Sequence, residues 1–326
     1  SQASVVDKLI NLQKRPEFIV MPGDLLDCPT APAGDVNPLH FPAVRDIWGN
    51  LIDGLEEQSI PVADGLGNHD LWTGFGGENV KGDIQQRNKK RIAEGSLFLP
   101  YGISTADNAA NYGNKGYHYT WFFSLEKNGK KVLVAFFMLN NLPGNANRTD
   151  PGDTGHGHDE GTYAFGALDY LNASMQTMAC KPGYDYKVGI PMFHINYGCD
   201  VNGDTHGNPE RWWTYADKKA LKDVLDKAPI QIVTAFFGHE HVGSIEKQTL
   251  YIGNRKDPAN KTGYSGYRCA CSIDKPRLNI IDLELVEENG GCKIKITPRF
   301  IEVAKLTSTD DCLPMIKEEL QSCIEL

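Results

Sequence analysis

The chain has 326 residues, of which 40% are hydrophobic and 23% are charged, values typical of a globular protein. Its 33 basic and 42 acidic residues give a net charge of −9 without a long basic cluster, which argues against a nucleic-acid or anionic-membrane partner. No apolar run approaches the roughly 18 residues of a membrane span, and no change of composition divides the chain, so we expect a single domain over residues 1–326.

The N-terminal part alternates helical and extended patterns. Residues 4–12 have the apolar spacing of a helix, and residues 18–21 form an apolar run typical of a strand that is buried on both faces. The pattern repeats with a helix over residues 44–58 and a short strand over residues 60–63. Residues 71–116 are rich in Gly, Asn and charge, so we expect a surface excursion there.

The remaining chain predicts a second sheet. An aromatic-rich hairpin over residues 116–125 and 131–139, joined by the turn at 127–130, begins it. The further predicted elements are a helix over 164–178, a strand over 186–193, a helix over 218–227, a strand over 230–237, strands over 278–286 and 292–300, and a final helix over 314–323. We expect the C-terminal part, about 244–326, to complete the second sheet.

Four of the predicted strands end in side chains that bind metals or transfer protons. The motif GDLLD (23–27) follows the first strand, GNHD (67–70) follows the second, His194 ends the third, and GHEH (238–241) ends the fourth. Ligands in open α/β sheets bind beyond the carboxyl ends of the strands, so we expect these four ends to share one site. Carboxylate, amide and imidazole ligands together suit Zn, Mn or Fe better than Ca or Mg.

This ordered set resembles the calcineurin-like metallophosphoesterase family, whose pattern includes GDxxD, GNH[DE], a lone His and GHxH. The resemblance covers roughly residues 17–245. It implies an α/β fold, a two-layered αβ sandwich of two mixed β-sheets flanked by helices. It also implies a hydrolase that cleaves a phosphate mono- or diester with a metal-bound hydroxide, using one or two divalent or trivalent transition metal ions per chain.

The resemblance assigns roles to individual residues. The metal ligands that it implies are Asp24, which would bridge two ions, Asn68, His194 and His239 for one ion, and His241 for the other. His69 would be the general acid that protonates the leaving oxygen, and Asp27 would orient its ring.

One motif of the family is missing. The family pattern opens with D-x-H on a strand before the first helix, whereas the D-x-H of this chain lies at 204–206, in a Gly/Asn-rich segment that we expect to be a loop. Either a strand upstream of Ser1 carries the motif or the metal site is reduced. We expect the upstream strand, because losing an interior strand would leave backbone groups of its neighbours unpaired. A reduced site leaves a rival function open, a non-catalytic binding or structural protein on the same fold.

Cysteines and glycosylation sequons favour a secreted or lumenal protein. The chain has eight Cys, an even number, and sequons at Asn147, Asn172 and Asn260. In a chain this long the cysteines could equally be buried thiols, but we expect at least two disulfides. The C-terminal half is the expected place for them, because five of the eight cysteines gather there: Cys269, Cys271, Cys292, Cys312 and Cys323.

Overall fold

The computed structural model describes residues 15–23, 54–55, 57, 60, 62–65, 67, 118–139, 167–198, 215–240, 243–252, 257–269, 277–288, 290–302 and 321–326, and all that follows refers to them. In chain order the elements are β1 (Ile19–Met21), β2 (Val62–Asp64), β3 (Tyr119–Lys127), β4 (Lys130–Met138), α6 (Ala167–Ala179), β5 (Tyr186–Phe193), α7 (Tyr215–Asp226), β6 (Gln231–Ile232), β7 (Phe236–Phe237), β8 (Glu246–Tyr251), the 3-10 turn η5 (Pro258–Asn260), β9 (Lys261–Arg268), β10 (Arg277–Glu288), β11 (Gly291–Glu302) and β12 (Ser322–Glu325).

The largest sheet is mixed, with strand order β3-β4-β5-β7-β9-β8 and β6 beside β5. Its central strands β4, β5, β7 and β9 run parallel, and the outer pairs β3–β4 and β8–β9 are antiparallel. Residues 132–138 of β4 are all buried, as expected for a parallel strand that is covered on both faces. A mixed sheet with a few helices gives the α/β class that the sequence predicts, but the second described sheet, β10-β11-β12, is antiparallel rather than mixed as expected.

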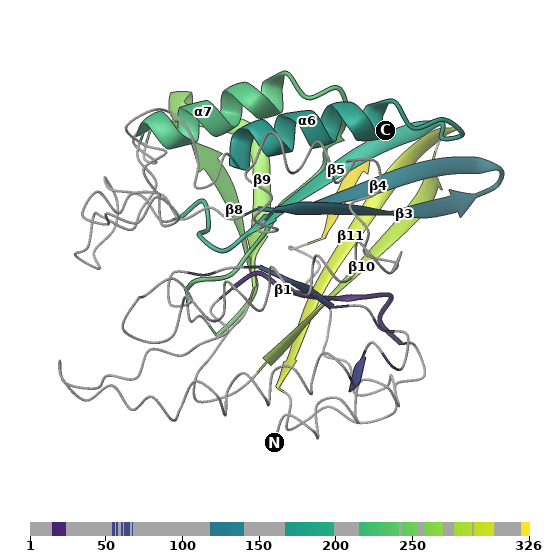
Figure 1. Cartoon of the computed structure of the whole chain (residues 1–326), viewed down its shortest axis with the longest axis horizontal. Helices are drawn as coiled ribbons and strands as arrows, with labels where there is room; N and C mark the ends of the chain where they lie inside the picture. Colours follow the sequence, from purple (N-terminus) through teal and green to yellow (C-terminus); the bar gives the residue numbers. More distant parts are fainter. Residues whose placement is uncertain are drawn as a thin grey trace.

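Each face of this sheet carries its own apolar core. Helices α6 and α7 lie side by side over one face, and β10, β11 and β1 lie on the other (Figure 1). Leu171 and Met175 of α6 pack with Phe137 and Phe193 beneath the helices. On the opposite face, Ile294 and Ile296 of β11 belong to the second core. The sheet is therefore the middle layer of the molecule.

Several elements lie where the sequence predicts them. Strand β5 coincides with the predicted strand over 186–193, and α6 and α7 lie within one turn of the predicted helices. The hairpin of β3 and β4 is also confirmed. Its turn residues Asn128 and Gly129 both have positive φ, 49° and 79°, as a two-residue hairpin turn requires.

Two predictions differ from the structure. The strand over 230–237 is interrupted, because only β6 and β7 pair within it. The final helix over 314–323 is wrong at its end: Ser322 and Cys323 belong to β12, and the remainder lies outside the described residues. The burial of β12 alternates, with Ile324 and Leu326 packed against the second core, and this period of two is that of a strand.

The C-terminal part, about 244–326, contributes to two sheets. Strands β8 and β9 extend the large sheet, whereas β10, β11 and β12 form a separate three-stranded sheet. Strand β12 also bonds to the large sheet: Gln231 Nε2 donates to the carbonyl oxygen of Glu325 at 2.8 Å, and Lys247 Nζ donates to Ser322 Oγ at 2.7 Å. It therefore links the two layers.

Strands β1 and β2 form a parallel pair that aromatic contacts anchor to the hairpin. The ring of Phe18 lies 5.7 Å from that of Trp121, 5.1 Å from that of Phe123 and 5.0 Å from that of Phe136, measured between centroids. Such ring pairs contribute about 0.5–1.5 kcal/mol beyond the burial of their area. The aromatic cluster thus holds β1 against the large sheet.

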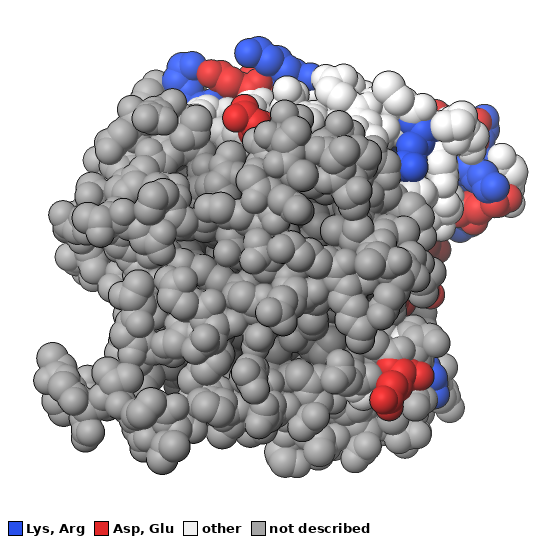
Figure 2. All heavy atoms as spheres, in the orientation of Figure 1, with Lys and Arg blue, Asp and Glu red and all other residues white. Residues whose placement is uncertain are grey.

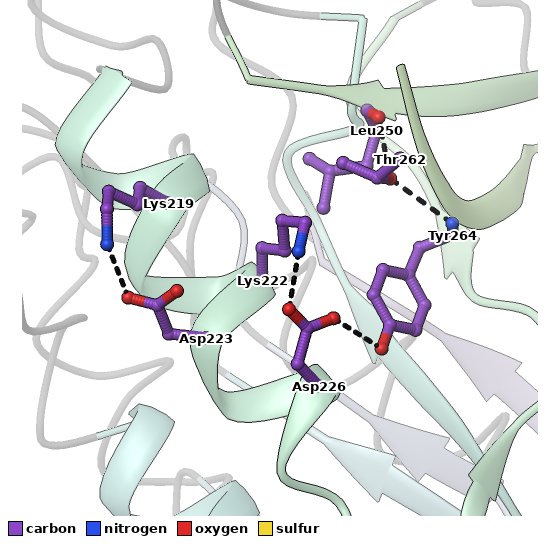
Figure 3. Close-up of polar contacts among 7 residues, drawn as sticks. All are labelled: Lys219, Lys222, Asp223, Asp226, Leu250, Thr262 and Tyr264. Atoms are coloured by element: carbon purple, nitrogen blue, oxygen red, sulfur yellow. Dashed lines mark hydrogen bonds and ion pairs between the residues drawn. The ribbon is translucent and has the colours of Figure 1, made fainter. Parts of the chain in front are cut away.

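Polar contacts fix α7 to β9 (Figure 3). Asp226 accepts hydrogen bonds from Lys222 Nζ and from the hydroxyl of Tyr264, the latter at 3.0 Å. These bonds, first that of Lys222, hold the pKa of Asp226 below its usual value. Burial, together with the neighbouring carboxylate, raises the pKa of Tyr264 to about 12, so the phenol remains a donor at neutral pH.

Basic and acidic side chains alternate on the described surface over α7 and at the tip of the hairpin (Figure 2). The ion pairs of these elements include Lys219–Asp223 on α7 and Lys131–Glu126 on the hairpin of β3 and β4. No helix in the described part of the chain combines the length and apolar character that a membrane crossing requires.

The cysteines that the structure describes do not bear out the expected pairing in the C-terminal half. Cys180, Cys292 and Cys323 carry free thiols. Cys323 pairs across the sheet with Lys295, three residues along β11 from Cys292. That offset separates the two sulfur-bearing residues by about 10 Å, beyond the roughly 7 Å that a disulfide bridges. Cys28, Cys199, Cys271 and Cys312 lie outside the described residues.

Gly266 allows β9 to approach β7 closely, and this generates a stability prediction. A Cβ built at Gly266 would lie 2.4 Å from the ring of Phe237 and 2.8 Å from the carbonyl oxygen of Ala235, whereas one built at Gly263 on the same strand meets nothing within 4 Å. We expect Gly266→Ala to lower the free energy of unfolding by about 1–3 kcal/mol and Gly263→Ala to raise it by about 0.5–1 kcal/mol. Urea denaturation of both variants measures the difference, and equal effects would contradict the close packing.

Candidate metal centre

The parallel pairing of β5 with β7 brings two of the predicted ligands together. Phe193 is in register with Phe237, so each strand ends at the same level, and the N–H of Gly238 donates to the carbonyl oxygen of His194 at 3.1 Å. Nε2 of His194 then lies 3.2 Å from Nδ1 of His239, with the rings at 80° to one another. The prediction that these strand ends are neighbours is confirmed.

The ends of β1 and β2 reach the same place. A Cβ built at Gly238 would lie 3.3 Å from Nδ1 of His194 and 3.4 Å from Cγ of Pro22, so Pro22, two residues before Asp24, is close to the imidazole pair. The N–H of Gly65 in turn donates to the carbonyl oxygen of Met21 at 2.8 Å, which keeps the end of β2 beside that of β1. All four strand ends therefore lie close to one another.

Five of the predicted site residues lie outside the described residues: Asp24, Asp27, Asn68, His69 and His241. Within the part of the chain that the structure does describe, no three His, Cys, Asp or Glu side chains gather closely enough to hold a metal ion. The imidazole pair is the portion of the predicted ligand set that the structure defines.

His239 occupies an unusual backbone conformation. Its φ is 75°, in the left-handed region, and the N–H of Glu240 donates to the carbonyl oxygen of Gly238 at 3.1 Å across it. A three-residue turn of this kind with positive φ is rare and strained for a residue that carries a Cβ. Strained residues of this type cluster at functional sites, where the surroundings hold them in place.

The imidazole pair fits a transition-metal site. Two imidazole nitrogens that each lie about 2.0–2.1 Å from one ion, at angles of about 90–109°, are about 2.8–3.4 Å apart. The 3.2 Å between Nε2 of His194 and Nδ1 of His239 falls in this range. The same separation suits a hydrogen bond between two neutral rings, so metal content is the measurement that separates these cases.

A buried loop supports His194, whose side chain is 1% exposed. The ring of Tyr197 lies 4.4 Å from that of Phe237 between centroids, and burial raises the pKa of its phenol far above the ordinary value. Nζ of the buried Lys218, on α7, donates to the carbonyl oxygen of Tyr197 at 3.3 Å. Helix α7 therefore fixes the loop that follows His194.

Sequence reasoning missed the polar residues behind the imidazole pair. Glu240 accepts hydrogen bonds from Nδ2 of Asn196 at 3.0 Å and from the guanidinium of Arg268. Asn196 lies two residues after His194, and Glu240 directly follows His239. Their positions next to the predicted ligands were the feature of the sequence that could have identified them. Arg268 lies on β9 with no motif to mark it.

Comparison with known proteins gives no family. No protein-family model matches the chain, and no curated protein matches it. Among solved structures, PhoD aligns with a TM-score of 0.40 and 8% sequence identity, covering 92% of this chain and 61% of that chain. The chain thus spans less than two thirds of the length of PhoD, and a likeness this weak defines neither family nor function.

The strained turn at His239 generates a prediction for the metal-free protein. At a position with positive φ, a residue with a Cβ costs about 1–2 kcal/mol of stability that glycine does not. At an ordinary position in regular structure, a protein with glycine is about 0.5–1 kcal/mol less stable than one with alanine. We therefore expect His239→Gly to be more stable than His239→Ala by about 0.5–1 kcal/mol, and the order to reverse at His194. Urea denaturation in the presence of a chelator measures both pairs, and the same order at both positions would argue against strain at His239.

Proposed function

We propose that this chain is a metal-dependent hydrolase of phosphate mono- or diesters with a calcineurin-like phosphoesterase fold. The observation that carries the proposal is the meeting of four strand ends, each followed in sequence by a predicted ligand or acid, with His194 and His239 3.2 Å apart. Unrelated histidines at the ends of separate strands would have no reason to lie this close to one another.

The proposed ligands come from all four strand ends. They are Asp24, Asn68, His194, His239 and His241, and they would hold one or two Zn, Mn or Fe ions. When bound, such ions supply positive charge beside the phosphoryl oxygens and make water a better nucleophile at neutral pH. The described ligands, His194 and His239, are imidazoles, which suit these metals better than Mg or Ca.

The protein itself supplies orientation and a proton. His69 directly follows Asn68 and would donate its proton to the leaving oxygen of the ester, while the carboxylate of Asp27 orients the ring and favours its charged form. The buried loop of Tyr197 and the turn at His239 keep the two described imidazoles in place, which is the preorganisation that a hydrolytic site needs.

Metal content and hydrolysis test the proposal together. Purified protein should contain at least one transition metal ion per chain and hydrolyse p-nitrophenyl phosphate or bis(p-nitrophenyl) phosphate. His194→Ala and His239→Ala should each lose the metal and lower kcat/KM by more than about 100-fold. Removing a residue that only hydrogen-bonds to a metal ligand already lowers metal affinity or activity by about 10–100-fold, and removing the ligand itself should cost more. Elemental analysis and initial rates measure these effects.

Ile190→Val is the matched control. Ile190 lies on β5, the strand that His194 follows, and is fully buried, and its truncation costs about 0.5–1.5 kcal/mol of stability without changing a proposed ligand. This variant should keep its metal and its rate. Wild-type protein without metal would refute the proposal, and protein with tightly bound metal but no hydrolysis of either ester would identify a binding protein instead.

The acid role of His69 makes a separate prediction. General acid catalysis contributes about 10²–10⁴-fold, and a leaving group that departs as a stable anion needs little of it. We expect His69→Ala to slow an alkyl phosphate ester by about 10²-fold or more and a p-nitrophenyl ester far less. Asp27→Asn should act in the same direction and more weakly. Equal losses of kcat on both esters would exclude the acid role.

A further inference from the structure

One carboxylate connects the two loops that carry the described imidazoles. Oε2 of Glu240 receives a hydrogen bond from Nδ2 of Asn196 at 3.0 Å, and Nη1 of Arg268 is bonded to the same oxygen. Asn196 belongs to the loop of His194, whereas Glu240 is the neighbour of His239. Any shift of one loop relative to the other would stretch these bonds.

Arg268 connects this carboxylate to the β8–β9 hairpin. Arg268 is the last residue of β9 and pairs across the ladder with Glu246 of β8, whose carboxylate binds its Nη2. The side chain of Arg268 is 10% exposed and that of Glu240 is 28% exposed. A charge pair this far from solvent resists separation, because either partner alone would remain poorly solvated.

The orientation of Asn196 is fixed from its other side. Asn196 is fully buried, and its Oδ1 accepts a hydrogen bond from the N–H of Gly198 at 2.8 Å. An amide has distinct accepting and donating ends, so this bond turns Nδ2 toward Glu240. Gly198 also donates to Oε1 of Gln248, on β8, at 3.0 Å. The β8–β9 hairpin therefore holds both loops, one through Gln248 and the other through Arg268.

We propose that Glu240, held by Arg268 and Asn196, is a positioning residue that sets the separation of the His194 and His239 rings. Through this separation Glu240 sets the affinity for metal, a consequence that rests on the proposed function. The strained turn at His239 needs such support, since positive φ at a residue with a Cβ persists only where its surroundings enforce it. The side chain of the next residue, Glu240, provides that support.

Glu240→Gln tests the proposal with the smallest change. The amide keeps the size of the side chain and its oxygen can still accept from Asn196 and Arg268, but without the negative charge the bond from the guanidinium loses about half of its strength. We expect the two rings to move apart or lose their fixed tilt in the metal-free protein. We also expect the Kd for Zn²⁺ to rise by about 10–100-fold.

Asp282→Asn is the matched control. Asp282 and Arg299 form an ion pair in the other sheet, with side chains 32% and 14% exposed, close to the values for Glu240 and Arg268. Loss of this pair should cost a similar amount of stability but leave the ring separation unchanged and the Kd for Zn²⁺ within about twofold of the wild type. A general loss of stability is thereby separated from positioning.

Two measurements decide the outcome: crystal structures of the metal-free variants, and Zn²⁺ affinity from competition with a chromophoric chelator. Moved rings together with weaker binding in Glu240→Gln support the proposal. Unmoved rings overturn it whatever the affinity, because Glu240 would then act on the metal only through its charge. Moved rings with unchanged affinity overturn the link between ring separation and metal binding.

Arg268→Gln and the double variant with Glu240→Gln provide an independent check. If Arg268 acts through Glu240, the double variant should bind Zn²⁺ as weakly as Glu240→Gln alone; additive losses would overturn the connection.

If Glu240→Gln fails to fold, Asn196→Ser removes the other donor to the carboxylate and serves the same test. Wild-type protein that binds no metal would refute the proposed function, while the metal-free ring separation would still decide the role of Glu240.

Discussion

The register between β5 and β7 is the constraint on which the candidate site depends. Because Phe193 pairs with Phe237 in parallel, the two strands end together and His194 and Gly238 follow at the same level. A slip by one residue would turn the side chains of one strand to the opposite face and separate the imidazoles. The rings of Phe193 and Phe237, 4.9 Å apart between centroids, lie in the core beneath α6 and α7. The same packing that stabilises the sheet thus specifies the site.

Support for the site comes from several of the described elements around it. Helix α7 fixes the loop of His194 through Lys218, β1 reaches the imidazoles through Pro22, and the β8–β9 hairpin contributes Arg268. These supports compensate for the cost of the strained residue His239. The protein therefore gives up some local stability at the strand ends and recovers it in the surrounding contacts, as is usual where a site must hold a geometry that the backbone alone disfavours.

Strand ends were predictable from the sequence because a buried parallel strand is an uninterrupted apolar run that stops at a Gly or a polar residue. Strand β5 illustrates this, since the run up to Phe193 stops at His194 as the structure has it. The polar network was not predictable. Arg268 is 28 residues from Glu240, and nothing in its local sequence distinguishes an arginine that binds a carboxylate from one that faces water. The strand β12 was missed since a short segment fits helical and extended periods equally well, and pairing with β11 decided between them.

Strand β12 has a consequence for motion. It pairs along its backbone with β11 of the three-stranded sheet, and through Ser322 and Glu325 it bonds to β8, β9 and β6 of the large sheet. Packed layers can slide over one another in small steps, a motion called shear. In this protein, shear between the two sheets would break all of these bonds at the same time. Under the proposed function, a substrate should therefore enter at the strand ends while the two sheets keep a fixed alignment.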